Sequence, residues 1–475
     1  MSTTSQASQR INALLDENSF VEIGGLVTAR ATDFNLKQTE TPSDGVVTGY
    51  GVIDGSLVYV YSQDASVLNG SVGEMHAKKI VNLYDLAMKM GAPVIGLIDS
   101  AGLRLQEATD ALNGFGEIYR SQVMASGVIP QITAVFGNCG GGLALIPAMT
   151  DFTFMEEKKA KLFVNSPNAL EGNEISRCDT SAAAFQSEET GLVDMVADEA
   201  SILAQIRQLV SILPANNADY ALTDCTDDLN RACAQIADCV GDTAIALSQI
   251  ADDGLFVEVK QDYAKDMVAG FIRLNGATVG AVANRTEVYN ADGEVTDKFD
   301  AVLSARGAQK AAEFVTFCDA FDIPVLSLTN VTGFAATKCS EKRMAKAVGK
   351  LTYAFANATV PKVNVIIGKA YGSAYVAMNS KAIGADITMA WPNAEIGMMD
   401  AKLAAKIICD GQGSEAIDAC AKEYAALQNN VISAAKRGYV DQIVEPADTR
   451  KYVIGAFEML AAKSEGRPEK KHGTV

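Results

Sequence analysis

Residues 92–102 read APVIGLIDSAG, and residues 323–333 read IPVLSLTNVTG. The two stretches align without a gap, and Pro93 pairs with Pro324 at an offset of 231 residues (324 − 93 = 231). Each stretch begins near a proline, continues as a mostly apolar run and ends at a glycine. Apolar runs without alternation are typical of strands covered on both faces of a parallel sheet. The pattern therefore predicts one buried strand in each half of the chain.

The same offset returns further along the chain. Pro130 pairs with Pro361, and Gly141 pairs with Gly372 (361 − 130 = 372 − 141 = 231). A shared offset in separate motifs indicates an internal duplication. Each half has a hairpin, a helix, a buried strand, a second helix, another buried strand and a glycine-rich turn into a helix. This order predicts two similar α/β domains.

The expected elements come in matching pairs. They are hairpins at 46–61 and 271–283, helices at 72–90 and 311–321, and buried strands at 94–98, 325–328, 132–136 and 363–367. Asn275 and Gly276 stand between two β-rich runs, which is a strong hairpin signal. The polar segment after Leu213 is typical of a linker, and 232–250 is expected to be helical. We therefore expect one domain at residues 1–213 and another at residues 231–475.

Composition excludes several classes of function. The net charge of −18 disfavours nucleic acid and anionic membrane as partners. The nine cysteines form no C-x-x-C motif, so we expect reduced thiols and no metal site. The only two histidines are His76 and His472, which disfavours triad hydrolases and histidine-based metal sites. The N-terminus lacks an apolar signal core and no run reaches 18 apolar residues, so we expect a cytoplasmic protein.

Two glycine-rich turns are the most informative features for chemistry. Residues 137–143 read GNCGGGL and residues 368–375 read GKAYGSAY. Each follows a buried strand and opens a helix, where unpaired amides and the positive end of the helix dipole favour an oxyanion or enolate. Neither matches a dinucleotide or phosphate-binding signature. One such turn alone is more simply explained as a tight strand–helix connection, but two at matched positions favour ligand binding.

Further motifs give the chain a family resemblance. They read DGVVTGYG at 44–51, GSVGEMHAKKI at 70–80, KAYG at 369–372, AWPNAEI at 390–396 and RPEKKHG at 467–473. Together with the 92–102 stretch they resemble the β subunits of propionyl-CoA and acetyl-CoA carboxylases and the related α subunits of biotin-dependent acyl-CoA decarboxylases. The resemblance runs nearly from end to end.

This resemblance implies two tandem crotonase-like ββα-spiral domains. The N-terminal domain would bind an acyl-CoA and the C-terminal domain biotin, with the active site between two subunits of a homo-oligomer, usually a hexamer. The implied partners are a biotin carboxyl carrier protein that brings biotin in trans, and either a biotin carboxylase subunit or membrane decarboxylase subunits.

The resemblance also implies site residues. Gly141 and Gly142 would hold the thioester enolate oxygen, and Ser373 and Ala374 the biotin ureido oxygen. The expected substrate-binding residues are Ala101, Gly102, Tyr375 and Val376.

Two departures from the family pattern concern the second half. Val376 stands where propionyl-type enzymes commonly carry an acidic residue, which leaves the acyl substrate open. The family usually carries a Gly-Ile-Ile-Arg-His-Gly-like segment after the position of Phe334, and residues 335–345 lack it.

Alternatives remain beside carboxyl transfer. A crotonase-type hydratase, isomerase or thioesterase would need a base near the first glycine turn, for which Glu107 is the nearest candidate. A non-catalytic scaffold subunit is a further possibility. The tetrapeptide AMKM at 87–90 matches the sequence around biotinylated lysines, but Lys89 closes an expected helix, so we expect it to be unmodified.

Overall fold

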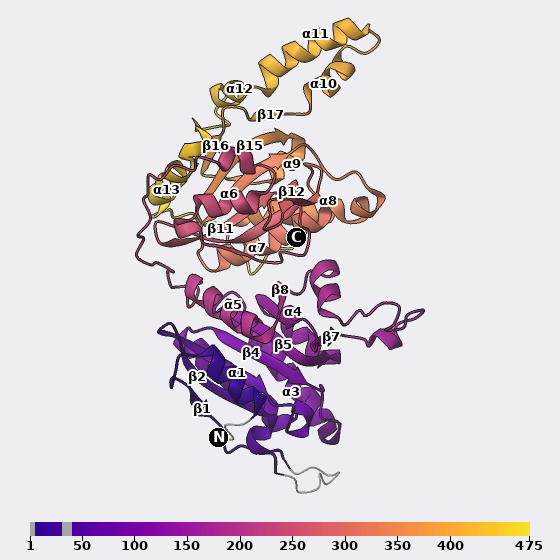
Figure 1. Ribbon diagram of the computed structural model, residues 1–475, viewed down its shortest axis with the longest axis vertical. Coiled ribbons are helices and arrows are strands. Elements are labelled where there is room, and N and C mark those ends of the chain that lie inside the picture. The colour runs from indigo at the N-terminus through magenta and orange to yellow at the C-terminus, as the bar shows by residue number, and fades with distance from the viewer. Residues whose placement is uncertain (1–4, 31–39) are drawn as a thin grey trace. The chain divides into compact units, whose positions relative to one another are not determined.

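The computed structural model describes residues 5–30 and 40–475. The chain divides into two compact units, Met1–Ala221 and Leu222–Val475 (Figure 1). The division falls inside the polar segment between the two expected domains. Each unit is built around an eight-stranded sheet in the part of the chain that the structure describes.

In the first unit the strand order is β1-β2-β3-β4-β5-β6-β8, and β7 also pairs with β5. The pairs β1–β2 and β2–β3 are antiparallel, whereas every pairing from β3 to β8 is parallel. The strands are β1 Val21–Ile23, β2 Val46–Ile53, β3 Ser56–Gln63, β4 Val94–Ser100, β5 Gln131–Gly140, β6 Phe152–Glu156, β7 Lys161–Phe163 and β8 Met195–Ala197. The helices are α1 Gln6–Leu14, α2 Glu74–Met90, α3 Ala108–Ala125, α4 Leu145–Met149 and α5 Glu199–Ile212.

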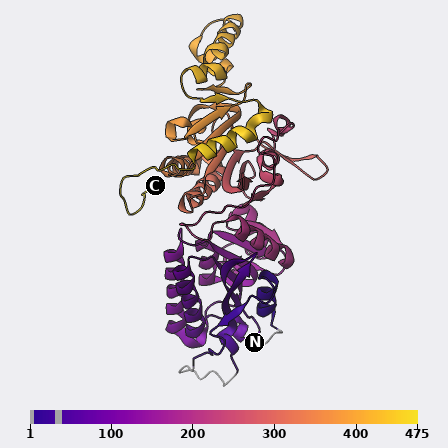
Figure 2. The ribbon, with the colours of Figure 1, turned by 90° about the vertical axis from the view of Figure 1, so that its left-hand side faces the viewer.

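The second unit repeats this plan with the order β18-β16-β15-β14-β11-β10-β9, and β17 also pairs with β15 (Figure 2). The strands are β9 Phe256–Glu258, β10 Met267–Leu274, β11 Ala277–Asn284, β12 Glu287–Tyr289, β13 Val295–Lys298, β14 Val325–Val331, β15 Lys362–Tyr371, β16 Ile387–Ala390, β17 Glu395–Gly397 and β18 Gln442–Ile443. The helices are α6 Thr243–Ile250, α7 Ala305–Ala320, α8 Lys338–Asn357, α9 Gly372–Ala377, α10 Ala401–Ile408, α11 Ser414–Tyr424, α12 Val431–Lys436 and α13 Thr449–Leu460.

The duplication extends to individual buried contacts. Lys79 and Lys310 stand 231 residues apart (310 − 79 = 231), and both are buried ammonium groups that donate to backbone carbonyls. The backbone N–H of Asp99 donates to the Gln63 side chain at the edge of the first sheet. At the matching place in the second sheet, the N–H of Asn330 donates to the side chain of Asn284.

The repeat offset changes inside each unit, for a structural reason. The hairpin strands β3 and β11 start 221 residues apart (277 − 56 = 221), whereas the later elements are 231 apart. The ten additional residues belong to the segment after β11, which forms the two-stranded ribbon β12–β13. The insertion therefore leaves the two sheets and their crossover helices equivalent.

Both hairpin turns have the geometry that their dipeptides predict. Asp54 and Gly55 have φ of 47° and 81°, and Asn275 and Gly276 have φ of 51° and 78°. Two successive left-handed residues define the mirror-image turn that matches the twist of paired strands.

Three expected helices have different bounds in the structure. The helix expected at 311–321 begins earlier, at Ala305, because the Ser304 side chain caps it by accepting from the Gly307 N–H. The helix expected at 72–90 begins at Glu74, after the extended Gly73. The helix expected at 232–250 is wrong in its first part, because α6 starts only at Thr243, where the Asp242 carboxylate accepts from the N–H of Ala244.

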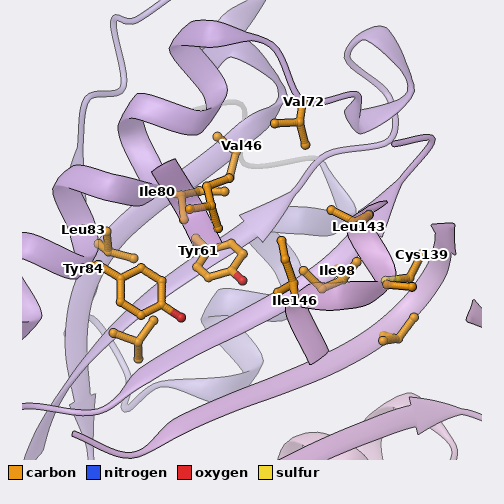
Figure 3. Packing of buried hydrophobic residues seen from close by; sticks show 14 of the residues in the cluster. Val46, Tyr61, Val72, Ile80, Leu83, Tyr84, Ile98, Cys139, Leu143 and Ile146 are labelled. Carbon is orange, nitrogen blue, oxygen red and sulfur yellow. The ribbon is translucent and has the colours of Figure 1, made fainter. Parts of the chain in front are cut away.

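The core of the first unit fixes the residues that follow its glycine turn. Figure 3 shows Leu143 and Ile146 in the same buried cluster as Tyr61, Tyr84 and Ile80, which come from β3 and α2. Lys89, which belongs to the last turn of α2, is part of a helix as expected. Among the described residues, no helix combines the length and apolarity needed to cross a membrane.

Candidate active site

The first glycine turn lies between β5 and α4. Its residues Gly141–Ala144 form a single 3-10 turn, and Gly141 has a φ of 63°. A Cβ on Gly141 would meet nothing within 4 Å, so the left-handed backbone, and not crowding, is what requires glycine there. The first N–H groups of a helical turn have no intrahelical acceptor. The turn therefore offers backbone donors beside open space.

The end of β4 lies next to this turn. Ser100 pairs with Cys139 across the two strands, and a Cβ on Gly102 would lie 3.6 Å from the Gly140 carbonyl oxygen. The N–H of Ala101 donates to the Asn69 carbonyl, and the N–H of Gly102 donates to the Ser100 hydroxyl at 3.1 Å. The structure thus brings Ala101 and Gly102 beside the turn, but their amides already have acceptors within the protein.

The second glycine turn has the same backbone geometry. β15 ends at Tyr371, and α9 begins at Gly372, which again has a φ of 63°. Here a Cβ would lie 3.2 Å from the Met398 carbonyl oxygen, so the second turn has a neighbour that the first lacks. Ser373 is exposed and Ala374 is buried beneath it.

The two remaining expected site residues follow on α9. Val376 is 36% exposed. Tyr375 packs against a small apolar cluster, and its burial raises the pKa of its phenol to about 12. The Tyr375 ring is therefore part of the wall of the unit, whereas Val376 faces outward from the start of α9.

Sequence reasoning missed the side chains that support the second turn. The Tyr371 hydroxyl donates to the Glu395 carboxylate on β17. The Asn429 side chain is buried and donates to the Met399 carbonyl at 3.0 Å. These contacts hold the segment after β17 against the turn. No local sequence signal could have found them, because they join residues tens of positions apart.

Glu107, the candidate base for a hydratase, lies in a buried ion cluster. It is 3% exposed, and its carboxylate pairs with the Arg104 guanidinium at 2.7 Å. Its second oxygen accepts from the N–H of Glu74. Asp44 pairs with the same guanidinium at 2.7 Å. Both oxygens of Glu107 are thus engaged in holding the start of α2 and the segment after β4 together, which disfavours a role as a base.

The two histidines also have ordinary surroundings. The His76 ring lies between Gln63 and the Asp44 carbonyl in the core, and burial lowers its pKa to about 3. It is therefore neutral and structural. His472 is exposed near the end of the chain.

Two ββα units, each with a glycine turn at matched positions, define a duplicated α/β fold with paired anion-binding turns. The carboxyl transferase domain family matches residues 4–475 of this sequence. The chain belongs to the carboxyl transferase family.

Curated relatives cover nearly all of the chain. A propionyl-CoA carboxylase beta chain from Roseobacter denitrificans is 41% identical and covers 99% of this chain and 93% of its own length. A methylmalonyl-CoA decarboxylase subunit alpha from Propionigenium modestum is 39% identical and covers 99% and 92%. The prediction of a carboxyltransferase subunit is confirmed at the level of the family.

A solved structure confirms the fold. The transcarboxylase 12S hexamer with hydrolysed methylmalonyl-CoA bound is 36% identical, with a TM-score of 0.92 over 98% of this chain and 92% of that one. A single-chain, multi-domain long-chain acyl-CoA carboxylase shares the fold, with a TM-score of 0.79 over 95% of this chain and 45% of that one. The prediction of two tandem crotonase-like domains is thus confirmed.

Proposed function

We propose that this chain moves a carboxyl group between biotin on a separate carrier protein and an acyl-CoA. The observation that carries the proposal is the pair of glycine turns, which share a φ of 63° at Gly141 and Gly372 in a chain of the carboxyl transferase family. One turn would serve the thioester and the other would serve biotin. The unit of residues 1–213 is then the acyl-CoA domain, and that of residues 231–475 is the biotin domain.

The first turn would stabilise the charge that develops on the thioester oxygen. Removing the carboxyl group or the α-proton leaves an enolate, whose oxygen the amides of Gly141 and Gly142 can receive. Ala101 and Gly102 flank this position and shape the backbone around the acyl group. Because these groups are backbone amides, the chemistry needs no histidine.

The second turn would hold the ureido oxygen of biotin with the amides of Ser373 and Ala374. The fit rests on the exposed position of Ser373 and on the unpaired N–H groups at the start of α9. Biotin, when bound, supplies the carboxyl-carrying nitrogen and takes up the α-proton. The residues of the chain supply alignment of the two reactants, which by itself is worth several orders of magnitude in rate.

The relatives suggest the setting. By analogy with the propionyl-CoA carboxylase and methylmalonyl-CoA decarboxylase subunits, we propose a short-chain acyl-CoA as substrate. The partners would be a biotin carboxyl carrier protein and a biotin carboxylase subunit, or membrane decarboxylase subunits. By analogy with transcarboxylase 12S, we propose a cytoplasmic homo-hexamer. Lys89 lies in a helix, so the biotin is expected on the carrier and not on this chain.

The test is biotin-dependent decarboxylation. Purified protein is incubated with methylmalonyl-CoA or malonyl-CoA, with and without free biotin or a biotinylated carrier, and the decarboxylated CoA ester is followed by chromatography. We expect product to form only when biotin is present. Equal rates with and without biotin would contradict carboxyl transfer.

A further inference from the structure

Tyr119 on α3 makes a direct contact with the first glycine turn. Its hydroxyl donates a hydrogen bond of 2.6 Å to the Gly142 carbonyl oxygen. A Cβ on Gly142 would lie 3.0 Å from this hydroxyl and 3.1 Å from the Phe115 ring. The rings of Phe115 and Tyr119 lie 5.8 Å apart, one helical turn from each other. The two aromatic side chains thus form a wall behind the turn.

The turn needs an external support because it has none of its own. Residues 140–142 are three successive glycines, which have the widest conformational freedom of any residue and no side chain to anchor. An oxyanion site works only if its donors already point at the place where charge develops. A hydrogen bond to the Gly142 carbonyl fixes one peptide plane of the turn from a rigid neighbouring helix.

The Tyr119 hydroxyl is a dependable donor. Partial burial raises the pKa of its phenol above the ordinary value, and the nearby Cys139 thiol adds to this shift. The hydroxyl therefore keeps its proton at neutral pH and can donate to the carbonyl throughout the working range.

The second unit shows that this contact is not a general requirement of the fold. The positions that match Tyr119 and Gly142 are Lys350 and Ser373 (119 + 231 = 350; 142 + 231 = 373). Lys350 is exposed, and Ser373 carries a side chain. Packing of the fold alone does not place a phenol behind this turn.

We propose that Tyr119 is a positioning residue for the thioester site: its hydroxyl holds the Gly142 carbonyl so that the amides of the turn are preset for the enolate oxygen. The inference rests on the proposed function and extends it, because it assigns to a side chain the order of a site made of backbone.

The test compares Tyr119→Phe with Tyr50→Phe. The first change removes only the hydroxyl and leaves the ring, so the fold should persist. Tyr50 lies on β2, where its ring packs 6.0 Å from that of Tyr59, and serves as the matched control. We expect kcat of biotin-dependent methylmalonyl-CoA decarboxylation to fall about tenfold in Tyr119→Phe, less than for loss of an oxyanion donor itself. The Kd for the acyl-CoA should change less than about twofold, since the ground state makes little use of the preset donors.

A second readout does not depend on the reaction. Hydrogen exchange measured by mass spectrometry on a peptide spanning residues 137–149 should be faster in Tyr119→Phe and unchanged in Tyr50→Phe, because the turn opens more often. Unchanged exchange would overturn the inference whatever the activity.

The activity outcomes separate the two claims. A wild-type enzyme without biotin dependence would contradict the proposed function, whereas an active wild type with equal kcat in Tyr119→Phe would contradict only the positioning role. A parallel loss of kcat and acyl-CoA affinity would also overturn it, because it would indicate a general structural defect.

Discussion

The two glycine turns share a backbone conformation but differ in what holds them. The first turn has no neighbour at Gly141 and is supported at Gly142 by the Tyr119 hydroxyl. The second turn lies against the Met398 carbonyl, beside a segment anchored by Asn429. After duplication, the unpaired amides were kept while the contacts behind them diverged. The comparison indicates that the amides are the shared requirement and that each support suits one ligand.

The strongest way to break the comparison is to fill the first turn. In Gly142→Val, the Cβ alone comes within 3.1 Å of Phe115 and 3.0 Å of Tyr119, and its methyl groups crowd the turn further. Losing one oxyanion donor typically lowers the rate by about a hundredfold or more, so we expect at least this loss in kcat. Circular dichroism should show the fold intact. Near wild-type turnover in a folded variant would mean that the turn is only a connection.

A second variant tests whether the buried acid near the first turn is structural. Glu107→Gln removes one charge from the cluster around Arg104 and places an amide against the N–H of Glu74. We expect a loss of unfolding free energy of about 2 kcal/mol, toward the lower end for breaking a buried pair. The kcat of the folded enzyme should stay within about threefold. Glu117→Gln, on the exposed face of α3, is the control. A stable but inactive Glu107→Gln enzyme would instead favour a catalytic acid, as in a hydratase.

The substrate preference offers a smaller effect. Val376 is partly exposed at the start of α9 and, by analogy with the family, lies near the acyl chain. Val376→Asp would place a hydrated charge there, so longer acyl chains should suffer more than short ones. We expect the ratio of kcat/KM for butyryl-type over acetyl-type substrates to fall about three- to tenfold, the low end for one methylene in a pocket. An unchanged ratio would remove Val376 from the pocket.

The smallest effect sharpens the difference in support. Gly141→Ala and Gly372→Ala both place a side chain on a left-handed residue, at a cost of about 1 kcal/mol each. Only the second also meets a neighbour, the Met398 carbonyl at 3.2 Å. We expect Gly372→Ala to lower the urea-unfolding midpoint more than Gly141→Ala, by an amount worth roughly 0.5 kcal/mol. The reverse order would show that the first turn is the more crowded one.

Much of the fold could be predicted because its signals are local. The dipeptides Asp54-Gly55 and Asn275-Gly276 determine their own turns, and the buried strands show as apolar runs at a fixed offset. The true start of α6 was missed because the cap at Asp242 competes with an apolar pattern that extends further back. The β12–β13 ribbon was missed because its strands are short and its insertion changes the repeat offset.

The candidate site divides in the same way. Glycines at strand ends mark the two turns in the sequence, since few other residues tolerate their backbone. Tyr119, Asn429 and the ion cluster around Arg104 carry no such mark, because each acts through contacts between segments distant along the chain. Only the folded structure reveals which side chains hold the turns in place.

The central claim is that the two turns serve one transfer of a carboxyl group. The most direct measurement follows the label from methylmalonyl-CoA carrying ¹⁴C in its free carboxyl group to a biotinylated carrier protein. The account predicts acid-labile label on the carrier with the wild-type protein, and none with either Gly142→Val or a matching Ser373→Pro variant, which lacks the amide at that position. Label released as carbon dioxide at the same rate without a carrier, or transfer that survives the loss of either turn, would contradict it.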